Sequence, residues 1–158
     1  MKKIVLAVLA LVVCIGMMTG CATPQLTKPK MKEDAKTVEI TGEISAQING
    51  DKLVITANNN LMDGTYCKIS VNNYAGKEIA SEEYTQEGGE KTCEFTIGED
   101  WPEVVYGFFI SSNGEPKGQE KEVRDVYGDR YENLTGAPVL WNNDGVSVVF
   151  QTETIEIK

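Results

Sequence analysis

Histidine is absent from this chain of 158 residues. Without it, neither a Ser-His-Asp nor a Cys-His nucleophile system of the usual kind can form, and zinc lacks its common nitrogen ligand. The acidic residues gather at turns, in water, so no side chain has an evident route to a pKa near neutrality. The sequence therefore predicts a protein that is not an enzyme and that carries no cofactor or metal.

Basic residues are also scarce, because 15 Lys and Arg stand against 24 Asp and Glu, a net charge of −9. Binding of nucleic acid or another polyanion requires a basic face. The lysine-rich stretch at 28–36 is interpreted either as a solvated linker or as a contact with anionic headgroups. We expect no nucleic-acid partner, and we expect instead a protein or an uncharged glycan.

Long apolar runs are missing except at the N-terminus. Lys2 and Lys3 precede a run from Ile4 to Met18, about fifteen residues, which is short of the roughly twenty that a spanning helix needs. A charged start followed by a short apolar run is typical of a secretory signal. Residues 1–20 are therefore predicted to be a signal peptide, and its removal takes away two lysines and leaves a net charge of −11.

One of the four cysteines has a distinctive setting. Met18-Thr19-Gly20-Cys21 resembles the lipobox of bacterial lipoproteins, although the pattern more often has Leu where Met18 stands. The resemblance implies acylation of Cys21, with palmitate-type chains that anchor the protein on the extracytoplasmic face of the cell membrane without spanning it. The alternative is an ordinary signal peptide that leaves Cys21 an unmodified thiol. Cys14 is a poorer candidate, because the bulky Val13 precedes it.

The rest of the chain divides into two parts. Residues 21–36 contain two prolines and many charged residues, and their apolar residues have no regular spacing. This composition is typical of a disordered tether next to the lipid. Residues 37–158 have the size of one domain. We expect that domain to be stable without metals or many disulfides.

Alternation of apolar and polar residues predicts that residues 37–158 are all-β. Ile44, Ala46 and Ile48 alternate before Asn49-Gly50-Asp51, which is a hairpin turn. Glycine-bearing turns recur about every ten residues, which favours an immunoglobulin or fibronectin type III-like antiparallel sandwich of eight or nine strands. Further strands are expected near 64–72, 77–84, 91–97, 104–112, 118–125, 137–142 and 145–157, the last with a bulge at 151–154.

A second resemblance covers most of residues 43–136. Leu53–Thr65 contains Asn60-Leu61-Met62-Asp63-Gly64-Thr65, which is similar to an Asn-Leu-Pro-Asp-Gly-Thr turn in uncharacterised bacterial lipoproteins with an immunoglobulin-like β-sandwich. Residues 119–136 resemble the second half of that group. Met62 stands where the group usually has Pro. The resemblance implies a sandwich lipoprotein and supplies no catalytic residue.

Two alternative functions remain open from the residues. A carboxylate-dependent glycosidase needs two acids about 5–10 Å apart, and candidates are Glu82-Glu83, Glu99-Asp100 and Glu132 near Asp129. A calcium-dependent adhesin needs oxygen-rich loops, and candidates are 58–63 and 142–145. Asn and Asp are ordinary turn formers, and a non-catalytic binding or structural module at the cell envelope is the main hypothesis.

The aromatic residues give two further expectations, one for side-chain orientation and one for a binding surface. Tyr106, Phe108 and Ile110 are predicted to point inward, and Phe109 with Val105 outward or toward a second layer. A binding surface is expected on loops at one end of the sandwich, formed by Met62–Gly64, Trp101 and Tyr127–Tyr131.

Cys67 and Cys93 fall on the same face of their predicted strands as apolar residues, so both should point into the core. Export to an oxidising compartment permits a disulfide between them. The bond requires Cα atoms within about 7 Å. The sequence leaves open whether the two cysteines are bridged or remain buried thiols.

Overall fold

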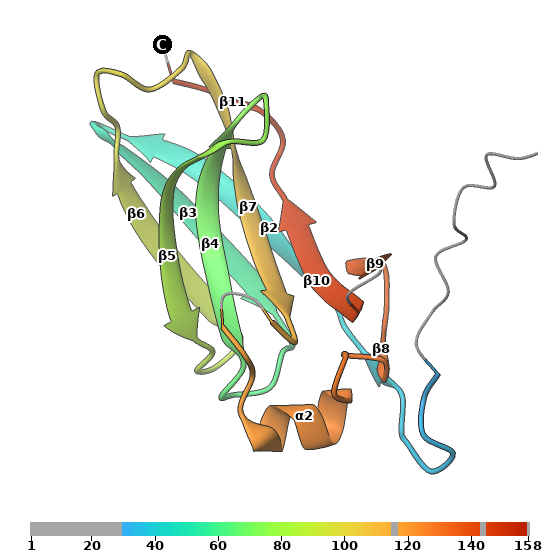
Figure 1. Ribbon diagram of the computed structural model, residues 1–158. Helices are drawn as coiled ribbons and strands as arrows, with labels where there is room; N and C mark the ends of the chain where they lie inside the picture. The colour runs from blue at the N-terminus through green and yellow to red at the C-terminus, as the bar shows by residue number, and fades with distance from the viewer. Residues whose placement is uncertain (1–29, 115–116, 143–144, 158) are drawn as a thin grey trace, which may run out of the picture.

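The computed structural model describes residues 30–114, 117–142 and 145–157 (Figure 1). These residues form two layers of antiparallel strands, so the predicted all-β sandwich is confirmed. Among the described residues, eight strands have four or more residues, in agreement with the expected eight or nine. They are β2 (Gly42–Asn49), β3 (Lys52–Asn59), β4 (Tyr66–Asn73), β5 (Glu78–Thr85), β6 (Glu90–Thr96), β7 (Val104–Ser112), β9 (Val139–Asn142) and β10 (Gly145–Gln151).

The smaller layer has the order β2-β3-β6 and contains the predicted hairpin. Strands β2 and β3 pair from Gly42 opposite Asn59 to Asn49 opposite Lys52. The turn between them holds Gly50 at φ 65°, a left-handed conformation that favours glycine.

The larger layer has the order β5-β4-β7-β10-β9, and β11 (Ile155–Glu156) pairs with β7 beyond the end of β10. Gln151 lies opposite Phe108 and Ile155 opposite Val105, so three residues on one strand face two on the other. This extra residue accommodates the change of parity that the sequence predicts near 151–154.

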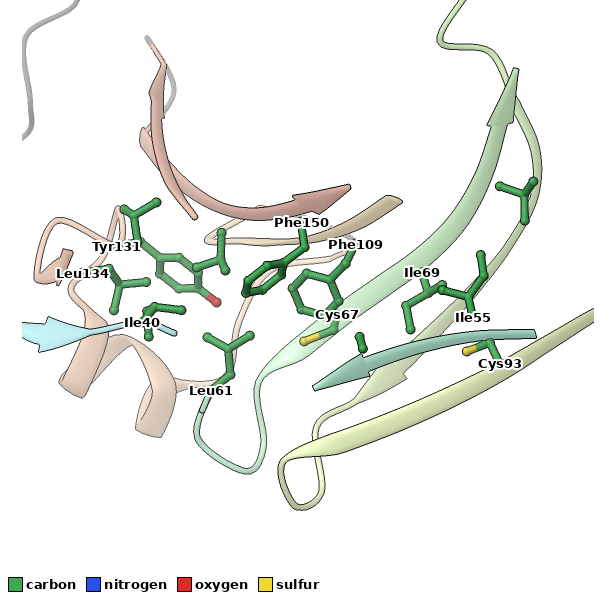
Figure 2. Close-up of a cluster of buried hydrophobic side chains, with 14 of the residues drawn as sticks. Ile40, Ile55, Leu61, Cys67, Ile69, Cys93, Phe109, Tyr131, Leu134 and Phe150 are labelled. Carbon is green, nitrogen blue, oxygen red and sulfur yellow. The ribbon is translucent and has the colours of Figure 1, made fainter. Parts of the chain in front are cut away.

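The core lies between the two layers (Figure 2). Ile55 of β3 lies over β7 at Gly107, where an added Cβ would come within 3.0 Å of the Ile55 side chain. Ile69 of β4 and Phe109 of β7 are fully buried opposite each other. Phe109 and Phe150 meet edge to face with their ring centroids 5.3 Å apart, a favourable aromatic geometry.

The inward orientation predicted for Tyr106, Phe108 and Ile110 of β7 is wrong, and of the two orientations left open for Val105 and Phe109 the one toward the second layer holds. Val105 and Phe109 are 0% exposed, whereas Tyr106, Phe108 and Ile110 are half-buried on the outer face. Apolar side chains occur on both faces of this strand, so the alternation of apolar and polar residues does not identify the face that points into the core. The deciding residue is Gly107, which shares the inner face and lets the second layer approach closely.

The strand predicted at 118–125 is a helix instead, α2 (Lys121–Tyr127). Val123 and Tyr127 are its buried residues, and they lie four apart, on one helical face. The residues between them are mostly charged or exposed. Three apolar residues in a helix of seven, Val123, Val126 and Tyr127, are too few to define a helical period in the sequence.

Two very short strands join the beginning of the domain to its later part. β1 (Val38–Glu39) pairs in parallel with β8 (Leu134–Thr135). The Ile40 amide donates to the Thr135 carbonyl at 2.7 Å, and Ile40 is buried. Gly136 follows at φ 118°, and a Cβ there would overlap the Ile40 carbonyl oxygen, so this position requires glycine.

Candidate functional site

The end of the sandwich that carries α2 gathers most of the predicted loop cluster. The Met62 amide donates to the Tyr127 hydroxyl at 2.7 Å, and an added Cβ on Gly64 would lie 3.9 Å from Val123. Trp101 does not join them. It follows β6 beside the β2–β3 turn, where Ile97 N donates to the Asp51 carbonyl, at the opposite end of the molecule (Figure 1).

The tyrosines of this end belong to the core. Tyr127 and Tyr131 pack edge to face with centroids 5.2 Å apart, and both are at most 1% exposed. Burial raises the pKa of each hydroxyl above its ordinary value. Tyr131 lies at φ 58° and its hydroxyl is 3.2 Å from the Ser111 hydroxyl. Neither ring face is available as a platform for a glycan.

A buried amide fixes the start of α2 on the larger sheet. Gln119 is 2% exposed. Its Oε1 accepts from the Tyr66 amide at 2.8 Å, and its Nε2 donates to the carbonyls of Tyr66 at 3.0 Å and Ser112 at 2.8 Å. The Gln119 carbonyl in turn accepts from the Arg124 guanidinium. This network holds the helix in place without a conventional side-chain N-cap.

A cavity of about 880 Å³ lies between residues 32–39 and α2, and we call it the α2 crevice. Val38 and Val126 give it apolar walls, and Asn133 lines it from the segment after the helix. Such a volume is in the range of small-molecule sites. The crevice is therefore the candidate site of this domain.

Charged side chains of both signs surround the α2 crevice, but several neutralise each other. Asp129, at its border, lies 3.9 Å from Lys32 and 4.0 Å from Arg124. Asp125 pairs with Lys121 one helical turn away. The crevice residues left without an ion-pair partner among the described residues are Glu33, Asp34, Glu39 and Lys36. Lys32 and Arg124 share the one carboxylate of Asp129, so the charges of the two signs nearly balance around the crevice.

Asn133 lies beside the α2 crevice with a side chain that is almost fully buried. The residue is 6% exposed, and its Nδ2 donates to the Val126 carbonyl at 3.0 Å. Its Oδ1 is buried without a hydrogen-bond partner in the part of the chain that the structure describes. An unsatisfied buried acceptor costs free energy. From the sequence, Asn133-Leu134-Thr135 is predicted only to be a turn, and nothing in that pattern marks Asn133 as a buried side chain.

The structure places Cys67 and Cys93 in opposite layers, both buried and both as free thiols. Burial raises the pKa of each thiol to about 12. The Lys91 ammonium, which lies 5.1 Å from the ring centroid of Tyr84, pairs with Glu82 at 2.6 Å beside this region. The thiols are therefore protonated packing groups here.

The candidate acidic pairs are engaged elsewhere or separated. Glu82 is held by Lys91, while its neighbour Glu83 is exposed. The Glu132 carboxylate accepts from the Arg130 amide at 2.8 Å and closes a turn.

The candidate calcium loop at 58–63 uses its oxygens to build turns. Asn59 Oδ1 accepts from the Leu61 amide at 3.0 Å, Asn60 Oδ1 from the Thr41 amide at 2.8 Å, and Asp63 Oδ1 from the Gly88 amide at 2.7 Å. Within the described ranges, no group of three His, Cys, Asp or Glu side chains has an arrangement that could hold a metal ion. Residues 143–144 of the second candidate loop lie outside those ranges.

Cys21 and the predicted signal peptide also lie outside the described residues. No helix in the part of the chain that the structure covers is long and apolar enough to cross a membrane. Comparison with protein-family models, curated proteins and solved structures finds no match to this chain. The resemblances to bacterial lipoproteins therefore stay predictions.

Proposed function

We propose that this protein is a lipid-anchored, extracytoplasmic binding module of the cell envelope. The α2 crevice is the observation that carries the proposal, because it combines apolar walls and charged rims in one concave site. The acidic balance of the chain argues against a polyanionic partner. A protein or an uncharged glycan is the expected partner.

The place of the crevice fits the proposed anchor. Residues 32–39 form one of its sides, and Lys30 stands nine positions after Cys21 in the sequence. Nine residues span at most roughly 30 Å when extended. An acylated Cys21 would therefore keep the crevice near the membrane surface, within reach of envelope components.

The anchor is tested by labelling cells with an alkyne fatty acid and capturing the protein. We expect the parent chain to take the label, the Cys21→Ala variant to lose it, and the matched Cys14→Ala variant to keep it. A parent without label, or label retained by Cys21→Ala, contradicts lipidation at this position.

The non-catalytic part of the proposal is tested separately. The purified chain is incubated with peptidoglycan and with common polysaccharides, and product release is measured. We expect binding without turnover. Turnover that disappears when one carboxyl residue is changed to its amide would establish a glycosidase instead.

A further inference from the structure

We propose that the outer edge of β2 binds an extended segment of another protein, which joins the smaller sheet as an added strand. This surface is separate from the α2 crevice, so the proposal goes beyond the function proposed above and does not depend on the lipid anchor. When a segment adds to an open sheet edge, backbone hydrogen bonds supply affinity and alternate side chains supply specificity.

The two layers of the sandwich differ in width at the side where β2 lies. The smaller layer ends at β2, whereas the larger layer continues past β10 to β9. Strand β2 itself lies against β7 and β10 of the larger layer. A strand placed next to β2 would therefore widen the smaller layer toward the width of the larger one.

Backbone groups along the edge of β2 are left without partners. The Asn60 amide donates to the Thr41 carbonyl immediately before β2 begins. Because hydrogen bonding between antiparallel strands alternates along each strand, the odd-numbered residues of β2 also bond to β3. The N–H and C=O groups of Ile44, Ala46 and Ile48 therefore point to the open edge, where no residue in the described ranges bonds to them.

The other outer strands of the two sheets are protected against strand addition. Short length and charged side chains are usual devices for this protection. Strand β9 has four residues, and β5 and β6 each carry three charged residues. Strand β2 is eight residues long, has no proline, and has Glu43 as its one charged residue. It is therefore the edge that stays available to a partner.

A groove of about 440 Å³ lies beside this edge, between residues 44–48 of β2 and residues 152–155. Ile44, Ala46 and Ile155 are partly buried, and Ile48 is 43% exposed. Side chains of an added strand alternate between the two faces of the sheet, so every second one would lie over these apolar residues. We therefore expect an apolar residue at every second position of the bound segment.

The charges at the groove favour a segment without acidic residues. Glu153 is the charged residue among those that line it, and Glu43 stands near the start of the same edge. Neither carboxylate has an ion-pair partner in the part of the chain that the structure describes. Complementary charge favours the right partner over others, so basic residues at the ends of the segment are expected.

The test is an NMR titration of the full chain, isotope-labelled and held in non-ionic detergent. The probe is the end-blocked peptide Lys-Thr-Val-Thr-Val-Thr-Val-Thr-Lys. We expect saturable binding that slows the exchange of the Ile44, Ala46 and Ile48 amides with solvent. The Ser45 and Gln47 amides, which already bond to β3, should change less. No saturable binding, or protection that appears elsewhere, overturns the proposal.

N-methylated probes test the backbone contact. With the valines over the groove, their N–H groups face β2 and those of the threonines face solvent. Methylating the three valine nitrogens should weaken binding at least about tenfold, because the hydrogen bonds to β2 are lost. Methylating three threonine nitrogens should weaken it much less, and equal losses overturn strand addition.

The charge of the probe is tested by replacing both of its lysines with glutamate. This change should weaken binding at least about threefold, because the new carboxylates approach Glu43 and Glu153. Equal or tighter binding of the acidic peptide overturns the expected chemistry of the partner.

Two lysine variants of β2 test the side-chain contact. Ile48→Lys places a charge on the groove face and is expected to weaken binding at least about fivefold. Gln47→Lys places the same charge on the outer face and is expected to have a smaller effect. Equal effects would show that charge alone governs binding and would overturn the groove contact.

A second copy of the chain is the alternative occupant of this edge. Analytical ultracentrifugation of the chain without peptide, together with amide exchange, detects it. We expect no dimer and fast exchange of the three edge amides. A dimer in which these amides are already protected would assign the edge to a second copy and overturn the proposal.

Discussion

Two regions of this molecule are stabilised in different ways. The hairpin body, residues 42–112, buries apolar side chains from alternating strands, such as Leu53, Ile69 and Phe109. The closing segment, residues 117–139, also buries apolar side chains, such as Val123 and Tyr127, and adds the buried amides of Gln119 and Asn133. The body is held mainly by non-directional burial, whereas the closing segment depends in addition on hydrogen bonds that fix individual positions. The candidate site lies beside the segment that has these added directional contacts.

The closing segment also contains the less common backbone conformations. Tyr131 lies at φ 58°, and Gly128 at φ 90° has the Glu132 carboxylate where a Cβ would stand. Strained positions persist only where the surroundings determine them. Here the buried carboxylate and the packed tyrosine ring provide those surroundings.

The largest expected effect is in the hairpin body. Phe109→Ala removes a fully buried ring that contacts Phe150, and the cavity should lower the free energy of unfolding by about 3–5 kcal/mol. Phe108→Ala, on the outer face of the same strand, is the matched control and should cost clearly less. Urea unfolding measures both, and equal losses would contradict the orientation of β7.

The buried thiols make the body sensitive to alkaline pH. Their pKa values are raised from 9.0 to about 12, so above pH 9 the unfolded chain releases protons that the native chain keeps. Stability is complete below pH 9 and falls as the pH rises toward 12. Between pH 8 and pH 10 we expect a loss of about 2–3 kcal/mol for the two thiols together, under reducing conditions.

The double variant Cys67→Ala/Cys93→Ala should largely remove this slope. Thiol titration of the parent, denatured without reductant, decides the open question of the bridge. Two reactive thiols are expected from the structure, and none would establish a Cys67–Cys93 disulfide and remove the basis of the alkaline effect.

A smaller effect is expected where the two regions meet. Tyr127→Phe leaves the Met62 amide without its acceptor, at a cost of about 1–2 kcal/mol. Tyr74→Phe, at a side chain that is 87% exposed, should change stability by less than about 0.5 kcal/mol. Urea unfolding again gives the values. A cost for Tyr127→Phe no larger than that for Tyr74→Phe would show that the hydroxyl contact does not hold the helix end.

The same division explains what could be predicted from the sequence. The β2–β3 hairpin was predictable because Ile44, Ala46 and Ile48 alternate and Gly50 marks the turn. The inner face of β7 was not, because it depends on the approach of Ile55 from the other layer, a contact 52 positions away in the sequence. Long-range packing overrides local pattern in this way.

The candidate site was less predictable than the fold. Met62–Gly64 and Tyr127–Tyr131 were expected together and do gather, but the tyrosines are buried and Trp101 lies at the other end. Helix α2 is only seven residues long, and Asn133 belongs to no recognisable pattern. The burial of Asn133 follows from the segments that pack around it, which only the three-dimensional arrangement reveals.

The joining of β1 to β8 has a mechanical consequence. Tension on the chain that precedes residue 38 enters the domain at this short parallel pair, where Val38 N and Ile40 N donate to the carbonyls of Asn133 and Thr135. Strand β2, with its eight paired positions along β3, comes next in the load path. A pull from that side therefore loads the two-residue β1–β8 pair first. This pair can break and re-form while the β-sandwich stays intact.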